Sequence, residues 1–265
     1  VLGGLVGGDN IVIIPERVRK LLSRVKSKIA LRKKNVEDRS VSFICYGFPP
    51  AVGAVGTAAL LNVEKSLENT LVALNDEGYD VGTVVRADSA YSVKGKRLGG
   101  GNVDGEDIVK ALKLLARDDL TAGGAAKAQE ALDDAGFWGM NVVGRTVTHK
   151  ELTGWLGKTM TQKMEAQWGS LESYSEIACS GSGKFSVLGL QFGKVFVGVQ
   201  PVLGIEGDPM RMLFERDLTP HPQYAAFYKW ISEELQPDTI VHFGMHGTVE
   251  WLPGSPLGNT AESWS

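Results

Sequence analysis

A strand–helix–strand pattern near the end of the chain narrows the fold class more than any other feature. A run rich in β-branched residues, KVFVGVQP at 194–201, stops at a proline, and a second apolar run, DTIVHFG, follows at 238–244. The intervening HPQYAAFYKWISEELQ at 221–236 has helical periodicity. Its buried side is predicted to consist of Tyr224, Phe227, Tyr228 and Ile231. The pattern predicts a βαβ unit, whose strands are parallel neighbours with a right-handed crossover.

An earlier segment, 40–85, repeats the same alternation. SVSFICYGF at 40–48 is short and apolar and ends at a Pro-Pro pair, so it is predicted to be a buried strand. A helix should follow, with Thr57 as its N-cap and Gly78 at its end. Its apolar face is predicted to be Leu60, Val63, Leu67, Leu71 and Leu74. We therefore expect an α/β fold in which βαβ units build a parallel sheet.

Residues 1–39 are predicted to form a basic lead-in helix ahead of this sheet. Between 15 and 34, apolar residues recur at steps of three and four, and lysines and arginines fill the other face. The apolar stripe consists of Val18, Leu21, Leu22, Val25 and Ile29. Two interpretations stay open: a packed helix with a solvated basic face, or a docking surface for an acidic partner or a membrane.

The stretch 86–184 is predicted to be a small insertion of helices and loops whose role the pattern does not reveal. Its first part is rich in glycine and charge, and two short helical patterns follow at 105–119 and 123–137. His149 stands alone beside a lysine and is interpreted as a surface residue. The last segment, 185–265, carries the second α/β unit and is expected to be truncated at its C-terminal end.

The composition is that of a globular protein without a strong electrostatic preference. The 265 residues are 43% hydrophobic and 22% charged, and the net charge is −3, so we expect no nucleic-acid partner. The two cysteines, Cys45 and Cys179, lack the spacing of a zinc knuckle or a disulfide scaffold. The chain begins without methionine, and its first residues do not have the pattern of a signal peptide. We expect it to be part of a larger multidomain protein.

Two glycine-rich stretches imitate nucleotide-binding loops without matching them. The glycines between 47 and 56 do not have GxGxxG spacing, and no lysine follows them as in a P-loop. In CSGSGKFSV at 179–187, Ala178 stands where a Walker motif needs glycine, and Phe185 stands where it needs Ser or Thr. We therefore do not expect this chain to bind ATP.

Polar residues gather in two segments that follow the strands of the C-terminal βαβ unit. They are Glu206, Asp208 and Arg211 after the first strand, and His242, His246 and Glu250 at the end of the second strand or after it. Open α/β sheets bind ligands at the carboxyl ends of their parallel strands. We therefore expect the two sets of residues to face one crevice, although they are far apart in sequence.

Three interpretations of the histidine-containing segment stay open. In a structural interpretation, His242 is a hydrogen-bonded residue at a strand end and Glu250 caps a following helix near Thr248. In a zinc-hydrolase interpretation, His246 and Glu250 lie one helical turn apart, but glycines interrupt the helix and the HExxH order is absent. In the third interpretation, imidazoles and carboxylates accept protons and make transient contacts with a hard cation.

Three stretches together resemble a known family. HFGMHGTVEWLPGSPLGN, VFVGVQPVLGIEGDPMRMLF and GFPPAVGAVGTAALLNV are similar to the large, porphyrin-binding H subunit of magnesium chelatase. The first two also resemble the related cobaltochelatase large subunit. The resemblance covers 11–85 and 185–265 well and 86–184 loosely. Ala261 and Glu262 differ from the family's pattern before the final Ser-Trp-Ser.

The resemblance implies insertion of Mg²⁺ into protoporphyrin IX on the route to chlorophyll. It also implies two AAA+ partners, the I and D subunits, which bind and hydrolyse ATP. The implied location is the chloroplast stroma in a eukaryote and the cytoplasm in a bacterium, and the basic lead-in helix is compatible with peripheral membrane association. A chain of this length is expected to be inactive alone.

Carried onto this sequence, the resemblance gives each polar residue a role. Proton removal and metal delivery are assigned to His242, His246, Glu250, Glu206 and Asp208. Transient Mg²⁺ contacts are assigned to Glu250, His246 and Glu206. Porphyrin binding is assigned to Arg211, which could instead pair with Asp208, and to Gly53, Gly56 and Thr57. A non-catalytic tetrapyrrole-binding or assembly module and a cobalt-inserting homologue stay open as alternatives.

Overall fold

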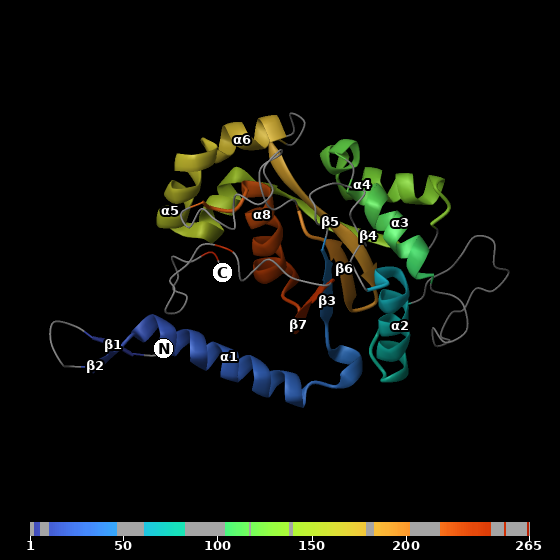
Figure 1. Cartoon of the computed structure of the whole chain (residues 1–265), viewed down its shortest axis with the longest axis horizontal. Helices are drawn as coiled ribbons and strands as arrows, with labels where there is room; N and C mark the ends of the chain where they lie inside the picture. The colour runs from blue at the N-terminus through green and yellow to red at the C-terminus, as the bar shows by residue number, and fades with distance from the viewer. Residues whose placement is uncertain are drawn as a thin grey trace.

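A computed structural model of the chain describes residues 3–5, 11–46, 61–82, 104–116, 118–137, 140–178, 183–201, 218–244, 252 and 264. Its centre is a five-stranded sheet in the order β4-β5-β6-β3-β7 (Figure 1). The strands are β3 (Val41–Cys45), β4 (Asn141–Thr148), β5 (Lys184–Phe192), β6 (Val195–Val199) and β7 (Thr239–Phe243). Helices pack on both faces of this sheet, which confirms the predicted α/β class.

The sheet is mixed, with a parallel part at one end. β3 is parallel to both of its neighbours, β6 and β7, whereas β5 is antiparallel to β6 and β4 is antiparallel to β5. The two strands of the predicted C-terminal βαβ unit are therefore parallel, as expected, but they are not neighbours, because β3 lies between them. All five residues of β3 are buried, and a strand that is buried on both faces suits a central position better than an edge.

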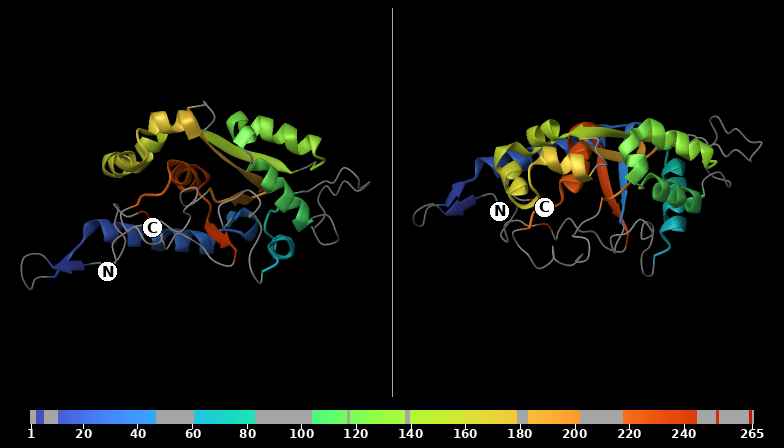
Figure 2. Two further views of the ribbon diagram at one scale, coloured as in Figure 1. Left: turned by 45° about the horizontal axis from the view of Figure 1, so that its top comes forward. Right: turned by 90° about the horizontal axis from the view of Figure 1, so that it is seen from above.

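Two groups of helices cover opposite faces of the sheet (Figure 2). One group is α2 (Val63–Asp76), α3 (Gly105–Leu115) and α4 (Asp118–Asp134). The other is α5 (His149–Trp168), α6 (Leu171–Ala178) and α8 (Pro222–Trp230), which continues into the π-helical turn η3 (Ile231–Leu235). Successive strand residues point to alternate faces, so Phe43 packs with the first group and Ile44 with the second.

The lead-in helix is present as α1 (Pro15–Lys33) and is followed by the 3₁₀ turn η1 (Val36–Asp38). A short hairpin of β1 (Gly3–Leu5) and β2 (Ile11–Ile13) precedes it. No residue of α1 is buried, and Leu21, Leu22, Val25 and Ile29 of its apolar stripe are 42–53% exposed, so the described part of the chain leaves most of this stripe uncovered. An ion pair of 2.6 Å between Lys34 and Asp238 joins the end of the helix to the start of β7. None of the helices in the described ranges is long and apolar enough to cross a membrane.

The helix after β3 begins later than the sequence pattern indicated. The side chain of Asn62 accepts a hydrogen bond from the Lys65 backbone N–H at 2.8 Å, so Asn62 and not Thr57 caps α2. Thr57 itself lies outside the described residues. The predicted end is confirmed: Gly78 has a φ of 89° and follows the last turn, a conformation that glycine adopts without strain.

The stretch between 86 and 184 contributes to the same sheet. Its two helical patterns are confirmed as α3 and α4, which cover one face of the sheet. The sequence pattern did not predict β4, which pairs with β5 along eight residues. β4 is an edge strand with a glycine in its middle and only one fully buried residue, Val147, so it lacks the continuous apolar run of the central strands.

Candidate functional site

The carboxyl ends of the three parallel strands lie side by side. Cys45, the last residue of β3, is in register with Val199 of β6 and with Phe243 of β7. The pairing continues one residue further on both sides. The Gln200 N–H donates to the Cys45 carbonyl at 3.0 Å, and the Tyr46 N–H donates to the Phe243 carbonyl at 3.3 Å. The chain therefore leaves this edge of the sheet at three adjacent points, where open α/β sheets bind ligands.

All of the predicted site residues lie on β7 or on the segments that begin at these three points. His242 is the member that the structure describes, in β7. The others lie outside the described residues; they are Gly53, Gly56, Thr57, Glu206, Asp208, Arg211, His246 and Glu250. The topology gives the segments that carry them a common origin at one edge, but the spacing between their side chains stays a prediction.

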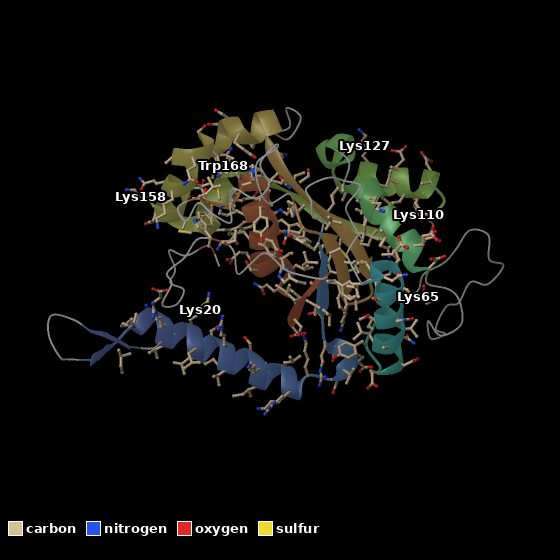
Figure 3. All side chains as sticks on the ribbon, in the orientation of Figure 1. Lys20, Lys65, Lys110, Lys127, Lys158 and Trp168 are labelled. Atoms are coloured by element: carbon tan, nitrogen blue, oxygen red, sulfur yellow. The ribbon has the colours of Figure 1, made fainter. Side chains whose placement is uncertain are left out.

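Two of these segments also return to a common place. Leu218 follows the segment that contains Glu206, and Leu252 follows the segment that contains His246. Both leucines are buried against Tyr224 of α8 in one small apolar cluster. Trp168, Tyr228 and Trp264 pack around this cluster, and Trp168 lies at the end of α5 (Figure 3). The two polar segments therefore start at the same edge of the sheet, on either side of β3, and return to the same helix.

His242 faces α8, on the side of the sheet that carries Ile44. The two residues are directly opposite each other in the parallel ladder between β3 and β7. The imidazole of His242 stacks on the phenol ring of Tyr228, with 5.9 Å between ring centroids and an interplanar angle of 22°. The ring is partly buried at the strand end, where an imidazole can accept or donate a proton.

Tyr228 connects His242 to the end of β6. Its hydroxyl donates a hydrogen bond of 2.8 Å to the side-chain carbonyl of Gln200, which is buried. Burial, and then the neighbouring Tyr224, raise the pKa of Tyr228 above its ordinary value. The phenol therefore stays protonated and remains a hydrogen-bond donor at neutral pH.

Two features of this region were not identified from the sequence. Tyr228 was predicted only as a buried helix residue, and Gln200 only as part of a strand; a glutamine between an apolar run and a proline was the available signal. The ring of His221, just before α8, contacts the ring of Trp168, with 4.0 Å between centroids and 32° between planes. Its Nδ1 lies 3.1 Å from the hydroxyl of Tyr174.

The described residues contain no group of three or more His, Cys, Asp or Glu side chains that could hold a metal ion. The predicted metal contacts, Glu206, His246 and Glu250, lie outside those residues. Cys45 lies at the strand end, but burial raises the pKa of its thiol to about 12. It is therefore protonated at neutral pH and is a poor metal ligand or nucleophile.

Comparison with known proteins gives a consistent result over nearly the whole chain. The family model described as CobN/Magnesium Chelatase matches residues 6–265. The magnesium-chelatase H subunit of Rhodobacter capsulatus is 38% identical over 250 residues, which are 94% of this chain and 18% of that protein. The CobN subunit of aerobic cobaltochelatase from Pseudomonas aeruginosa is 30% identical over 235 residues, which are 88% of this chain and 16% of that protein.

A solved structure supports the fold. The catalytic subunit of cobaltochelatase from Mycobacterium tuberculosis superposes with a TM-score of 0.61 at 22% sequence identity. The match covers 96% of this chain and 19% of the other. The chain thus spans less than a fifth of the length of these relatives.

Proposed function

Because the chain belongs to the CobN/magnesium chelatase family, we propose that it forms part of the metal-insertion site of a tetrapyrrole chelatase. The observation that carries this proposal is the common edge at the ends of β3, β6 and β7. All three segments with predicted site residues begin there. A flat macrocycle held at this edge would meet groups from each of them.

The chemistry of metal insertion explains why such groups are needed. Two pyrrole N–H protons must leave the macrocycle before a divalent cation can occupy its centre, so bases must lie close to the ring. We assign proton removal to His242, His246 and Glu250, with Glu206 and Asp208 as a second set of carboxylates. Mg²⁺ gives up its waters reluctantly, and the oxygens of Glu206 and Glu250 are suitable replacements for them. Arg211 and the segment with Gly53, Gly56 and Thr57 would bind the porphyrin.

We further infer that the metal is Mg²⁺ and the tetrapyrrole is protoporphyrin IX. The H subunit of R. capsulatus magnesium chelatase is 38% identical to this chain, and the P. aeruginosa CobN protein is 30% identical, which favours magnesium. Cobalt insertion is the alternative. In either case AAA+ partners of the I and D types would hydrolyse ATP, in the chloroplast stroma of a eukaryote or the cytoplasm of a bacterium.

The test uses the full-length protein with protoporphyrin IX, ATP and its ATPase partners. The fluorescence of the magnesium product gives the rate with Mg²⁺, and the loss of fluorescence of the free porphyrin gives the rate with Co²⁺. We expect His242→Ala, His246→Ala and Glu250→Ala each to slow insertion by about 10²-fold or more, the usual value of a positioned acid or base. His149→Ala is the matched control, because His149 follows β4 at the other end of the strand order. Normal rates in His246→Ala and Glu250→Ala would show that the catalytic assignment is wrong.

A non-catalytic module is the second candidate, because the chain covers only part of its relatives. Quenching of porphyrin fluorescence by the isolated 265-residue chain tests it. Binding without any effect of the three substitutions on insertion by the full-length protein would favour a tetrapyrrole-binding or assembly role.

A further inference from the structure

The ring of Tyr228 packs against the imidazole of His242. His242 stands on an edge strand, where no further strand of the described residues pairs with β7. Its imidazole lies on the face of the sheet that carries α8 and contacts that helix. There, the phenol ring of Tyr228 lies nearly parallel to it, at 5.9 Å between centroids and 22° between planes. Aromatic rings in this range attract each other in offset stacks.

The position of the Tyr228 ring is fixed from several directions. Tyr224 lies 4.7 Å and Phe227 lies 5.4 Å from it between ring centroids. At the far end, the hydroxyl donates to Gln200, and the backbone N–H of Gln200 donates to the carbonyl of Cys45. One side chain thus connects α8 to the ends of β6 and β3 while its ring contacts β7.

This arrangement differs from that of an ordinary core tyrosine. A partly buried phenol needs a hydrogen-bond partner, and a partner anywhere would serve stability. Here the partner is the residue at which the chain leaves β6 for the segment that contains Glu206 and Asp208. The same contact therefore ties the orientation of His242 to the start of the second carboxylate set.

We propose that Tyr228, held by Gln200, is a positioning residue that sets the orientation of the His242 imidazole toward the tetrapyrrole. The inference rests on the proposed function, in which His242 accepts a proton from the macrocycle. Tyr228 acts through His242 and takes no part in the proton transfer itself. Small errors in the placement of a reacting group are costly, because a shift of about 1 Å can reduce a rate by about 10²-fold.

The first arm of the test separates the ring from its hydroxyl in the full-length protein, with protoporphyrin IX, Mg²⁺ and the ATPase partners. Tyr228→Leu removes the stack and should lower kcat by about 10-fold to 100-fold, with the KM for porphyrin changed less than about 2-fold. Tyr228→Phe keeps the stack and should lower kcat by only about 3-fold. Gln200→Leu should lower kcat by the same factor, and the double variant should show no larger loss than either single variant. Tyr79→Leu is the matched control, because Tyr79 packs against the core on the other face of the sheet.

The second arm asks whether the loss depends on His242. When His242 is already alanine, Tyr228→Leu should cause no further fall in kcat, because the residue to be positioned is absent. Independent, multiplying losses would overturn the positioning role, and so would a normal kcat in Tyr228→Leu. A melting temperature is recorded for every variant. If Tyr228→Leu does not fold, Tyr228→Phe and Gln200→Leu are used instead, and neither should lower kcat further when His242 is alanine. A normal rate in His242→Ala would overturn the proposed proton acceptor and the positioning role together, whereas a slow His242→Ala beside a normal Tyr228→Leu would overturn the positioning role alone.

Discussion

Gly189 offers a stringent test of the packing beneath the candidate site. It lies on β5 directly opposite Gly198 of β6, and the ring of Phe196 lies over both positions. A Cβ atom at Gly189 would overlap this ring and would lie 2.7 Å from the carbonyl oxygen of Val197, closer than real Cβ atoms approach. Phe196 is 1% exposed and packs edge-on against Trp230 of α8, so the ring has little room to move away.

We therefore expect Gly189→Ala to lower the free energy of unfolding by about 1–3 kcal/mol, the usual cost of overpacking a core. Gly154→Ala is the matched control, because nothing lies within 4 Å of its Cβ position on α5. There alanine should raise the free energy of unfolding by about 0.5–1 kcal/mol, as in an ordinary helix. Urea unfolding followed by circular dichroism measures both changes. If Gly189→Ala unfolds at the same urea concentration as the wild type, the close packing of β5, β6 and α8 is refuted.

Three further predictions concern other parts of the chain. Burial raises the pKa of Asp238, but hydrogen bonds from Lys34 and Ser40 outweigh this effect, so the pKa is lowered overall. The ionised carboxylate therefore stabilises the fold at pH values above the pKa of the unfolded state. This stabilisation is lost as pH falls through the pKa of the folded state. Asp238→Asn should cost roughly 1 kcal/mol at pH 7 in urea titrations, and the cost should shrink as pH falls through the folded pKa; a cost that does not change with pH would contradict this. Leu22→Ser on α1 should change the free energy of unfolding by less than about 0.5 kcal/mol, whereas the fully buried Leu67→Ala should cost about 2–5 kcal/mol; similar values would refute the exposure of α1. Cys45 should react with iodoacetamide only after unfolding, because its thiol is buried and protonated, and rapid labelling of the folded chain at this residue by mass spectrometry would be incompatible with that.

The sequence predicted the parallel part of the sheet because its signals are local. β6, α8 and β7 have apolar runs and helical periodicity that need no knowledge of the rest of the chain. The place of β3 between β6 and β7 depends on long-range pairing, which periodicity does not report. β4 was not predicted because an edge strand interrupted by glycine lacks a strong apolar pattern. Thr57 was predicted as the N-cap of α2 because threonine is a good cap. Asn62 is also a good cap, and it lies directly before the helix.

In the candidate site, too, some features could be predicted from the sequence and others depend on long-range packing. The common edge for the polar segments followed from topology alone, because parallel strands end at the same side of a sheet. The stack between His242 and Tyr228 did not, because the two residues are on different elements and their contact depends on how α8 crosses the sheet. Gln200 acquires its importance from the same crossing, through the hydroxyl of Tyr228.

Tetrapyrrole binding at the carboxyl ends of β3, β6 and β7 is the central claim. A cryo-electron microscopy map of the full-length protein with bound protoporphyrin IX tests it most directly. We expect the macrocycle at this edge, with the imidazole of His242 directed toward it and the segments with Glu206 and His246 on its sides. A macrocycle bound at the opposite edge of the sheet, or in a part of the full-length protein distant from β7, would contradict the claim.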